Sequence, residues 1–521
     1  MLARGHRSPP LFALAAVLAS VAVTAACGSD EPSAGPDAST EPDAGTPGTP
    51  RTDGGDAGDG GADAAADATP DAPPDTSKCA DGIQNGAETD LDCGGPCAPC
   101  AQCARCSMAS DCETGNCMEG RCGPVLQSLP ALDATRRSLR HRLDAIESGM
   151  RCELGIYHDV VGILGRESYR FSESEPRWTG ELLGAGASVL DAKAFYVTRP
   201  FEARYWVARI ARKVQDESAA AAQLTPGEKK GYAAYARTIV AYQLLLNLTL
   251  SDANGLRVDV LDTTAAPTTK SDALAHIETL LNDGFADLTD ATFSFPVTPA
   301  FESFPDPASF GKLNRALAAR VALYRERWAD ALTYLGQSFF DLNGDFAHGA
   351  YLRHSTVPGD MPNPLFLPPN ATGEARVAHP SFAADVVPGD DRIGKTIVRD
   401  SPVSQAGLTS GRDVRRYDSA VAAIPIIRNE ELMLIFAEAK LRQNALPDTV
   451  VAINRVRTGH NLPPYAGAIS TPALLDELLH QRRYSLFLEG HRWIDVRRTD
   501  RLATLPLDRV DDDVWSEFPL P

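Results

Sequence analysis

Cysteine is the most densely clustered reactive residue type in this 521-residue sequence. Nine of the 11 cysteines fall within segment 79–122, which contains few large hydrophobic residues. A segment so poor in apolar side chains needs cross-links to hold a fold, and these can be disulfides or a bound metal. The nine residues of this cysteine-rich module are Cys79, Cys93, Cys97, Cys100, Cys103, Cys106, Cys112, Cys117 and Cys122.

Cys27 is a candidate for a different modification. It follows an apolar run at 11–26, preceded by Arg4 and Arg7, that ends in small residues. This is the pattern of a bacterial lipoprotein signal, so we expect 1–27 to be a signal peptide whose Cys27 receives a lipid anchor. Gly28, which is not acidic, is compatible with sorting to the outer membrane. The alternative is an ordinary secretory signal with a chance cysteine.

The export signal bears on the choice between disulfides and zinc. Four cysteines, at positions 97, 100, 103 and 106, have the two-residue spacing of zinc ligands. Export to an oxidising compartment favours disulfides instead. Because nine is an odd number, we expect Cys152 either to bridge the module to the following domain or to stay buried and reduced.

Oxygen-bearing side chains at the start of the module could bind calcium, as in short calcium-stabilised repeats of extracellular proteins. The alternative is a series of turns, in which Asn, Asp and Gly are favoured for backbone reasons. The candidate ligands are Asp81, Asn85, Glu88, Asp90 and Asp92. No other cofactor or metal is expected.

The sequence contains no specific catalytic motif: it has no Gly-rich phosphate loop, no Gly-x-Ser-x-Gly elbow and no His-Glu-x-x-His motif. His158 and Asp159 could form half of an acid/base pair, and Glu489 with Asp495 could imitate glycosidase carboxylates. Five arginines near the latter two would keep both ionised, which is unsuitable for a general acid. We therefore predict a structural charge network and no enzyme; the network residues are Glu489, Arg492, Asp495 and Arg498.

The net charge of −19 is largely local. Segment 28–78 holds twelve acidic residues against Arg51 and Lys78 and no aromatic residue, so it is predicted to be a disordered tether. Since no basic stripe exists elsewhere, nucleic-acid binding is not expected.

From 123 to 521 the sequence is predominantly helical in pattern. Apolar residues recur at helical spacing, and Thr225 with Glu228 forms a capping box ahead of one long helix. Small and bulky residues alternate over 313–335, as in tetratricopeptide-like helix pairs. We expect a mostly α fold, a right-handed tetratricopeptide-like helical stack, with a loop-rich irregular subdomain over 343–425. The predicted helices span about 139–146, 157–165, 201–214, 226–248, 272–288, 313–335, 429–441, 450–459, 471–486 and 489–498.

The last hundred residues carry the most specific pattern. An apolar helix beginning near Arg428 is followed by Ile453-Asn454 with Val456-Arg457, and then by Arg482-Arg483 and by Glu489-Gly490 with Arg492, Asp495 and Arg497. This series resembles the C-terminal signature of the SusD/RagB-like outer-membrane nutrient-binding lipoproteins. Gln481 and Ser485 depart from it, because that family usually has Glu at both positions.

The resemblance covers about 131–521 and implies a function. It implies the same helical architecture and a surface-exposed lipoprotein of the outer membrane that binds a nutrient. The expected nutrient is an oligosaccharide, and a peptide is the alternative ligand. It also implies a partner, a TonB-dependent transporter of the SusC type, to which the ligand is delivered. A helical scaffold without a small ligand is the second hypothesis, and a weak hydrolase is the third.

Aromatic side chains on ordered loops are the residues to seek for sugar binding, since sugars stack on exposed rings. Trp206, Trp328 and Trp493 fall on apolar helical faces, whereas Trp178 lies in an aperiodic segment. Trp178 is therefore the predicted platform, with a place against the scaffold as the alternative. The full set of predicted ligand-binding residues is Trp178, Arg177, Tyr169, Tyr351 and Phe366.

Overall fold

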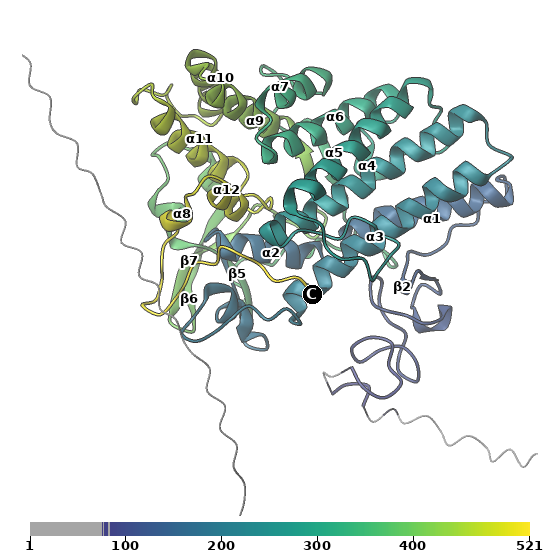
Figure 1. Ribbon diagram of the computed structural model, residues 1–521. Coiled ribbons are helices and arrows are strands. Elements are labelled where there is room, and N and C mark those ends of the chain that lie inside the picture. Colours follow the sequence, from purple (N-terminus) through teal and green to yellow (C-terminus); the bar gives the residue numbers. More distant parts are fainter. Residues whose placement is uncertain (1–75, 77, 82–83) are drawn as a thin grey trace, which may run out of the picture. The chain divides into compact units, whose positions relative to one another are not determined.

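The computed structural model describes residues 76, 78–81 and 84–521. Cys27 and nearly all of segment 28–78 lie outside these residues. The described chain is predominantly helical (Figure 1), and the predicted fold class is confirmed. The α-helices are α1 (Ala134–Arg151), α2 (Leu154–Leu164), α3 (Phe195–Ala220), α4 (Pro226–Ser251), α5 (Lys270–Asp287), α6 (Pro307–Tyr324), α7 (Trp328–Gln337), α8 (Pro380–Ala384), α9 (Asn429–Arg442), α10 (Leu446–Gly459), α11 (Thr471–Ser485) and α12 (Arg492–Arg498).

Successive helices pack side by side from α3 to α7, and α9 continues the stack against α7, α10 and α11. The start of α4 follows the sequence closely. The Thr225 hydroxyl accepts a hydrogen bond from the Glu228 amide at 3.2 Å, and the Glu228 carboxylate accepts one from the Thr225 amide at 2.8 Å. This capping box satisfies two of the amides that a helix start leaves unpaired.

The described chain also contains strands that helical periodicity could not reveal, most of them in the irregular subdomain. The strands are β1 (Cys117–Met118), β2 (Arg121–Cys122), β3 (Ser168–Ser172), β4 (Gly349–Leu352), β5 (Glu374–Ala378), β6 (Thr396–Gln405), β7 (Leu408–Val414) and β8 (Ile424–Arg428). One antiparallel sheet has the order β3-β5-β7-β6, and two-stranded sheets join β1 to β2 and β4 to β8. The aperiodic segment that contains Trp178 is therefore preceded by a strand, β3.

Short 3-10 helices complete the secondary structure of the described residues. They are η1 (Ala109–Asp111), η2 (Pro176–Trp178), η3 (Glu181–Leu183), η4 (Asp252–Asn254), η5 (Leu288–Asp290), η6 (Pro299–Phe301), η7 (Asp391–Lys395) and η8 (Leu502–Thr504). No helix in the described part of the chain combines the length and apolar character needed to span a bilayer.

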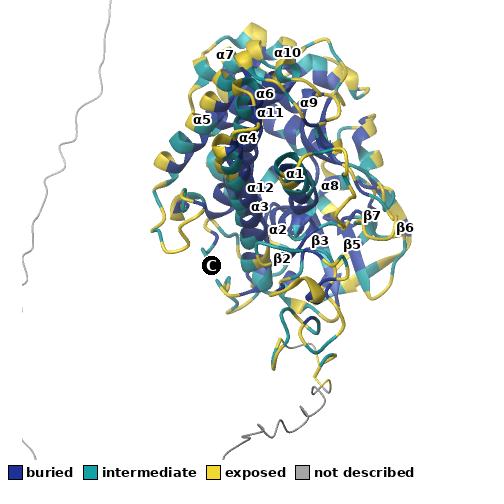
Figure 2. Ribbon diagram, turned by 90° about the vertical axis from the view of Figure 1, so that its right-hand side faces the viewer, coloured by how far each residue is buried: buried dark blue, intermediate teal, exposed yellow. Residues whose placement is uncertain are grey.

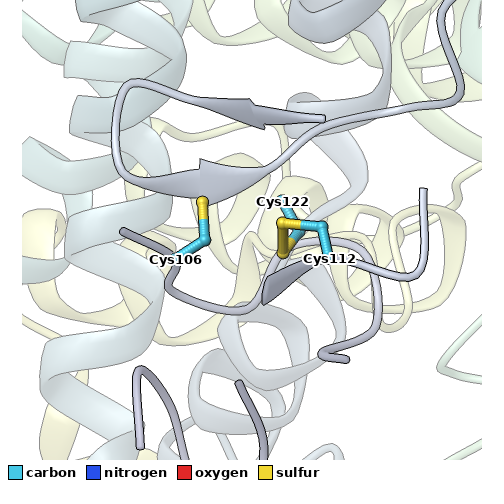
Figure 3. Close-up of side chains that lie close together, drawn as sticks. All are labelled: Cys106, Cys112 and Cys122. Carbon is cyan, nitrogen blue, oxygen red and sulfur yellow. A yellow bond between two sulfur atoms is a disulfide. The ribbon is translucent and has the colours of Figure 1, made fainter. Parts of the chain in front are cut away.

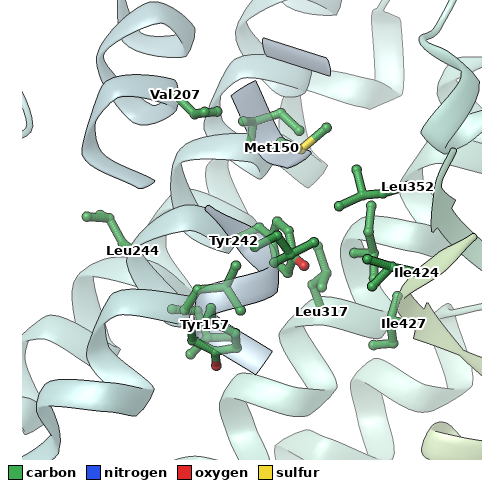
Figure 4. Packing of buried hydrophobic residues seen from close by; sticks show 14 of the residues in the cluster. Met150, Tyr157, Val207, Tyr242, Leu244, Leu317, Leu352, Ile424 and Ile427 are labelled. Carbon is green, nitrogen blue, oxygen red and sulfur yellow. The ribbon is translucent and has the colours of Figure 1, made fainter. Parts of the chain in front are cut away.

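Buried residues line the inner faces of the helices, and exposed residues lie mainly on outer faces and connections (Figure 2). The main core joins helices to the small β4–β8 sheet (Figure 4). Met150 of α1, Tyr242 of α4 and Leu317 of α6 pack in the same cluster as Leu352 of β4 and Ile427 of β8. The strand pair is thus fixed to the helical scaffold by burial of apolar side chains.

Disulfides hold the cysteine-rich module, as predicted. Four pairs lie within it: Cys79–Cys97, Cys93–Cys100, Cys106–Cys117 and Cys112–Cys122. The fifth, Cys103–Cys152, links the module to the C-terminal end of α1, which is the bridging alternative for Cys152. Further contacts support this link, because the Trp206 indole N–H donates to the Met118 carbonyl at 2.8 Å.

The sulfur atoms of Cys106, Cys112 and Cys122 lie within 4.8 Å of one another (Figure 3). This closeness follows from two neighbouring disulfides, since Cys106 is bonded to Cys117 and Cys112 to Cys122. Disulfide sulfurs are not thiolates, and the thiolate is the form of cysteine that binds zinc. The pairing therefore favours the disulfide interpretation of the module.

Candidate functional site

A cleft of about 490 Å³ opens where the irregular subdomain meets the C-terminal helices. Its walls come from the segment leading into β4, from η7, from the connection between β7 and β8, and from the adjoining ends of α9 and α10. We call it the Tyr351 cleft. Its lining residues are Phe346, Ala347, Tyr351, Arg353, Lys395, Arg416, Ala423, Arg428, Glu430 and His460.

Tyr351 is the only one of the five predicted ligand-binding residues that lines this cleft. It lies on β4, where the pairing with β8 shifts register between Ala350 and Tyr351. A β-bulge of this kind redirects a side chain relative to a regular strand. The phenol donates a hydrogen bond to the Ala347 carbonyl, which fixes the ring, and burial raises the phenol's pKa. The half-buried ring is thus held in a defined orientation.

Charged side chains form the inner wall of the cleft. Arg428, the last residue of β8 and the N-cap of α9, contacts Glu489 through its Nε at 3.0 Å and also contacts Glu430. Arg416 Nη2 lies 2.9 Å from the other Glu489 oxygen. Two guanidiniums therefore share one carboxylate at the base of the site.

His460 extends this network towards the rim. Its Nε2 lies 2.7 Å from Glu430 Oε1, and its Nδ1 lies 2.8 Å from Asp391 Oδ1. The ring also packs against Phe346 with centroids 5.3 Å apart. His460 thereby connects the end of α10 to η7 and to the start of α9.

Glu489 is ionised in this environment. Burial alone would raise the pKa of its carboxyl, but Arg428, Arg416 and Lys395 outweigh that effect and lower the pKa to about 2. The same reasoning applies to Asp495, where Arg482 and Arg498 outweigh burial and lower the pKa well below its usual range. Neither group can therefore hold a proton for general acid catalysis near neutral pH.

The predicted charge network is correct in part. Arg498 contacts Asp495 at 2.7 Å, as expected from their spacing, and also contacts Glu438 at 2.6 Å. The expected contact between Glu489 and Arg492 is wrong, because α12 begins only at Arg492 and Glu489 lies in the preceding turn. Gly490 has φ +82°, a left-handed conformation that glycine adopts readily, and this turn directs Glu489 towards β8.

Arg492 is consequently left without a carboxylate in direct contact among the described residues. Burial and the nearby Arg483 lower its pKa to about 10, while Glu167 acts in the opposite direction. Its surroundings are a separate pocket of about 240 Å³ that is also lined by Arg483, Arg501 and His480.

Trp178 does not have the exposed ring that was predicted. It ends η2, is only 6% exposed, and packs edge-on against Phe195 with centroids 5.0 Å apart. The loss of helical periodicity in this segment reflects a strand and short 3-10 turns that pack on the core, so the alternative placement against the scaffold is the observed one.

The other predicted ligand residues near Trp178 are also engaged internally. Tyr169 is 2% exposed and stacks on Phe171 within β3. Arg177 contacts Glu175 and lies over the Phe195 ring at 4.8 Å. Phe366 is half-buried and does not line the Tyr351 cleft. These residues do not converge on one binding surface.

Sequence reasoning missed most of the cleft. Arg353, Lys395 and Arg416 lie in segments without periodicity, and nothing local in the sequence links them to His460. Arg428 and Glu430 lie in the stretch with the most specific pattern, but that pattern predicts only a helix for them. A recognisable signal was the density of cations on either side of β8.

The calcium candidates make contacts that suit a turn. The side-chain amide of Asn85 donates to Asp81 Oδ2 at 2.8 Å. The main-chain N–H of Asp81 donates to Asp92 Oδ1 at 3.0 Å. Glu88 accepts from the Asn85 main-chain N–H at 3.1 Å, and Asp90 accepts from that of Arg105 at 2.6 Å. Side-chain oxygens of Glu88, Asp90 and Asp92 therefore accept from main-chain N–H groups of the module, and calcium binding stays a prediction.

His158 and Asp159 do not act as an acid/base pair. Asp159 contacts Arg376 through both carboxylate oxygens, at 2.6 and 2.7 Å. Burial lowers the pKa of His158 to about 3, so its imidazole is neutral at physiological pH. The pair is part of the core between α2 and β5.

A second and larger cavity, of about 670 Å³, lies between the cysteine-rich module, α3 and segment 257–267. Two of its four lining arginines are paired, since Arg105 and Arg121 both contact Glu202, at 2.7 and 2.8 Å. Its aromatic ring, Tyr205, is covered on one side by Arg257 at 5.4 Å.

Comparison with known proteins finds a match for the segment that supplies half of the residues lining the Tyr351 cleft. The model of the SusD family matches residues 409–507. This segment is similar to the SusD family. It supplies Arg416, Arg428, Glu430 and His460 of the cleft and Glu489 behind them. No curated protein matches the sequence.

Solved structures extend the similarity to the fold of the larger SusD-like region. Surface glycan-binding protein A from Bacteroides thetaiotaomicron has a TM-score of 0.56 at 13% identity, over 70% of this chain and 90% of that chain. The same protein in complex with laminarihexaose gives 0.55 at 13%, over 70% and 91%. A SusD-like carbohydrate binding protein from Bacteroides vulgatus gives 0.55 at 16%, over 71% and 84%. At these identities the comparison shows a shared fold.

Proposed function

We propose that this protein binds oligosaccharides at the cell surface through the Tyr351 cleft. The observation that carries the proposal is an oriented, half-buried aromatic ring beside charged hydrogen-bonding groups in one cleft. Sugar rings present apolar C–H faces that stack on aromatic rings and hydroxyls that pair with guanidinium and carboxylate groups. The names of the structural relatives, which are glycan-binding and carbohydrate-binding proteins, support the same ligand class.

We further propose that the protein is a lipid-anchored component of the outer membrane. The sequence pattern around Cys27 supports the anchor. The resemblance to SusD-like lipoproteins supports delivery of the ligand to a TonB-dependent transporter of the SusC type. Affinity purification of the tagged full-length protein from solubilised outer membranes should recover a large outer-membrane barrel protein if this partnership exists.

Binding is favoured over catalysis by the charge state of the site. Glu489 and Asp495 are held ionised by arginines, and Glu430 is buried with its pKa lowered well below the usual value: burial would raise it, but Arg428 and His460 outweigh burial. A glycosidase needs one carboxyl group that stays protonated until it donates to the leaving group. The carboxylates of this site do not provide such a group.

The test is binding of a glycan array by the protein, followed by titration calorimetry with the best ligand. Tyr351→Ala should weaken binding at least about tenfold, the equivalent of about 1.4 kcal/mol. Tyr465→Ala is a matched control, because Tyr465 is also half-buried and donates to a nearby carbonyl, that of Ala468, but lies outside the cleft. If no glycan binds, the protein is better described as an interaction scaffold.

A further inference from the structure

The inner wall of the Tyr351 cleft carries more positive than negative charge. It has three cations, which are Lys395, Arg416 and Arg428. Two carboxylates lie beside them, those of Glu430 and Glu489. Arg428 contacts both carboxylates, and Arg416 contacts Glu489. Among the described residues, no carboxylate therefore contacts Lys395 directly.

Lys395 is instead held by the backbone. Its Nζ donates to the carbonyls of Tyr484 and Ser485 at 2.7 and 2.6 Å. An ammonium group has three N–H donors, so one donor is without a protein partner in the described chain. Since Lys395 lines the cleft, this donor is available to a ligand.

The surroundings of Lys395 disfavour its charged form, so a nearby negative charge would be stabilising. Burial lowers the pKa of Lys395 to about 7. Glu489 and Glu430 oppose this decrease, whereas Arg428 and Arg416 act in the same direction as burial. An anion placed beside the ammonium would offset part of this unfavourable burial.

A second cation stands at the rim. The Arg353 side chain is 49% exposed, and its guanidinium lies 6.0 Å from the centroid of the Tyr351 ring. Its partner Glu302 is 56% exposed, and exposed ion pairs contribute little to stability. Arg353 can therefore exchange this partner for a ligand at small cost.

We propose that the Tyr351 cleft selects oligosaccharides that carry an acidic group, with a sugar face against Tyr351 and the acidic group beside Lys395. The inference rests on the proposed function and adds the substrate class. A neutral sugar would cover Lys395 while offering only hydroxyl oxygens, whereas a carboxylate or sulfate forms a charge-assisted hydrogen bond and balances the third cation. Arg353 would add a second contact for a polyanionic chain.

The experiment compares probes of equal length on the full-length protein. An oligogalacturonide tests a carboxylate, a carrageenan oligosaccharide tests a sulfate, and a malto-oligosaccharide is the neutral reference. We expect at least one acidic probe to bind about tenfold or more tightly than the neutral one, with affinity that falls as salt increases. The stronger acidic probe identifies the acidic group.

Two pairs of variants assign the preference to the cleft. Lys395→Met should abolish the preference for the acidic probe, whereas Lys312→Met, the same change at an exposed lysine outside the cleft, should retain it. If Lys395→Met does not fold, Ala347→Glu on the exposed wall should weaken only the acidic probe, with Ala347→Gln as the neutral control.

The outcomes separate the two proposals. Equal binding of neutral and acidic probes, or a preference that survives Lys395→Met or Ala347→Glu, overturns the acidic selection while leaving oligosaccharide binding in place. Failure of every glycan to bind overturns both.

Discussion

Cys103 of the cysteine-rich module is bonded to Cys152 at the end of α1, across 49 residues of sequence. Because the other four disulfides of the described chain close within the module, this pair is the only one of the five that cross-links the module to the helices. We expect the double change Cys103→Ser and Cys152→Ser to increase cleavage between module and helices in limited proteolysis. The loss of a native disulfide typically costs about 2–5 kcal/mol.

The matched control is Cys79→Ser with Cys97→Ser, which removes a disulfide inside the module. It should leave cleavage near the junction unchanged. Mass spectrometry of the non-reduced protein should find the five pairs; stoichiometric zinc with free thiols in 79–122 would contradict the disulfide assignment.

Glu489→Gln should be strongly destabilising. The change leaves Arg428 and Arg416 sharing a neutral amide in a buried site, and removal of one partner of a buried ion pair costs on the order of 3–5 kcal/mol. Asp290→Asn makes the same chemical change in the exposed contact with Lys230 and should cost under about 1 kcal/mol. Urea unfolding measures both, and equal losses would show that Glu489 is a solvated surface group.

Glu167 should make stability fall as pH rises. Burial raises the pKa of its carboxyl to about 8, against the opposing effects of Arg492 and of the Leu488 N–H. The folded protein then binds a proton that the unfolded chain releases near pH 4.5, so the stabilisation is complete below about pH 4.5 and is lost towards about pH 8.

The measurement is the unfolding free energy at pH 5 and at pH 8 for the wild type and for Glu167→Gln. The glutamine side chain has nearly the shape of glutamate but cannot ionise. The unfolding free energy of the variant relative to the wild type should therefore increase by a few kcal/mol from pH 5 to pH 8. Parallel pH profiles would mean that Glu167 has an ordinary pKa.

Replacing Cys27 with Ser should release the protein from the membrane fraction. Cys27 lies outside the described residues, so this prediction rests on the apolar run and the small residues before it. Fractionation with detection by antibody measures the change, and Cys152→Ser serves as a cysteine control without effect on anchoring. Unchanged membrane association of the Cys27 variant would disprove lipidation at this residue.

Helices were predictable because their determinants are local. The capping box of Thr225 and the apolar spacing after Asn429 each specify a helix within a few residues, and both helices are observed. α11 spans Thr471–Ser485, one residue shorter than the predicted 471–486. Strand partners are distant: Tyr169 pairs with Val377, which in turn pairs with Asp413. No short sequence window contains that information.

The site was less predictable than the fold, for two physical reasons. Aperiodic sequence indicates irregular backbone but not exposure, and Trp178 is irregular yet buried. The second reason is Gly490, which the sequence pattern places inside a helix over 489–498. Its positive φ interrupts the helical backbone there and turns Glu489 towards Arg428. Tyr351, one of the predicted ligand-binding residues, lines a cleft, and its role in binding stays a prediction. Lys395 and Arg416 meet it only through tertiary contacts.

The turn at Gly490 also has a kinetic consequence. Glu489 is held by ion pairs to Arg416 and Arg428, and Gly490 packs so closely on Tyr157 that a Cβ there would lie 3.0 Å from the ring, so these contacts fix the base of the cleft. A ligand therefore meets a surface that exists before binding. Association should follow a single step whose observed rate rises linearly with ligand concentration, and differences in affinity among glycans should appear mainly in their dissociation rates.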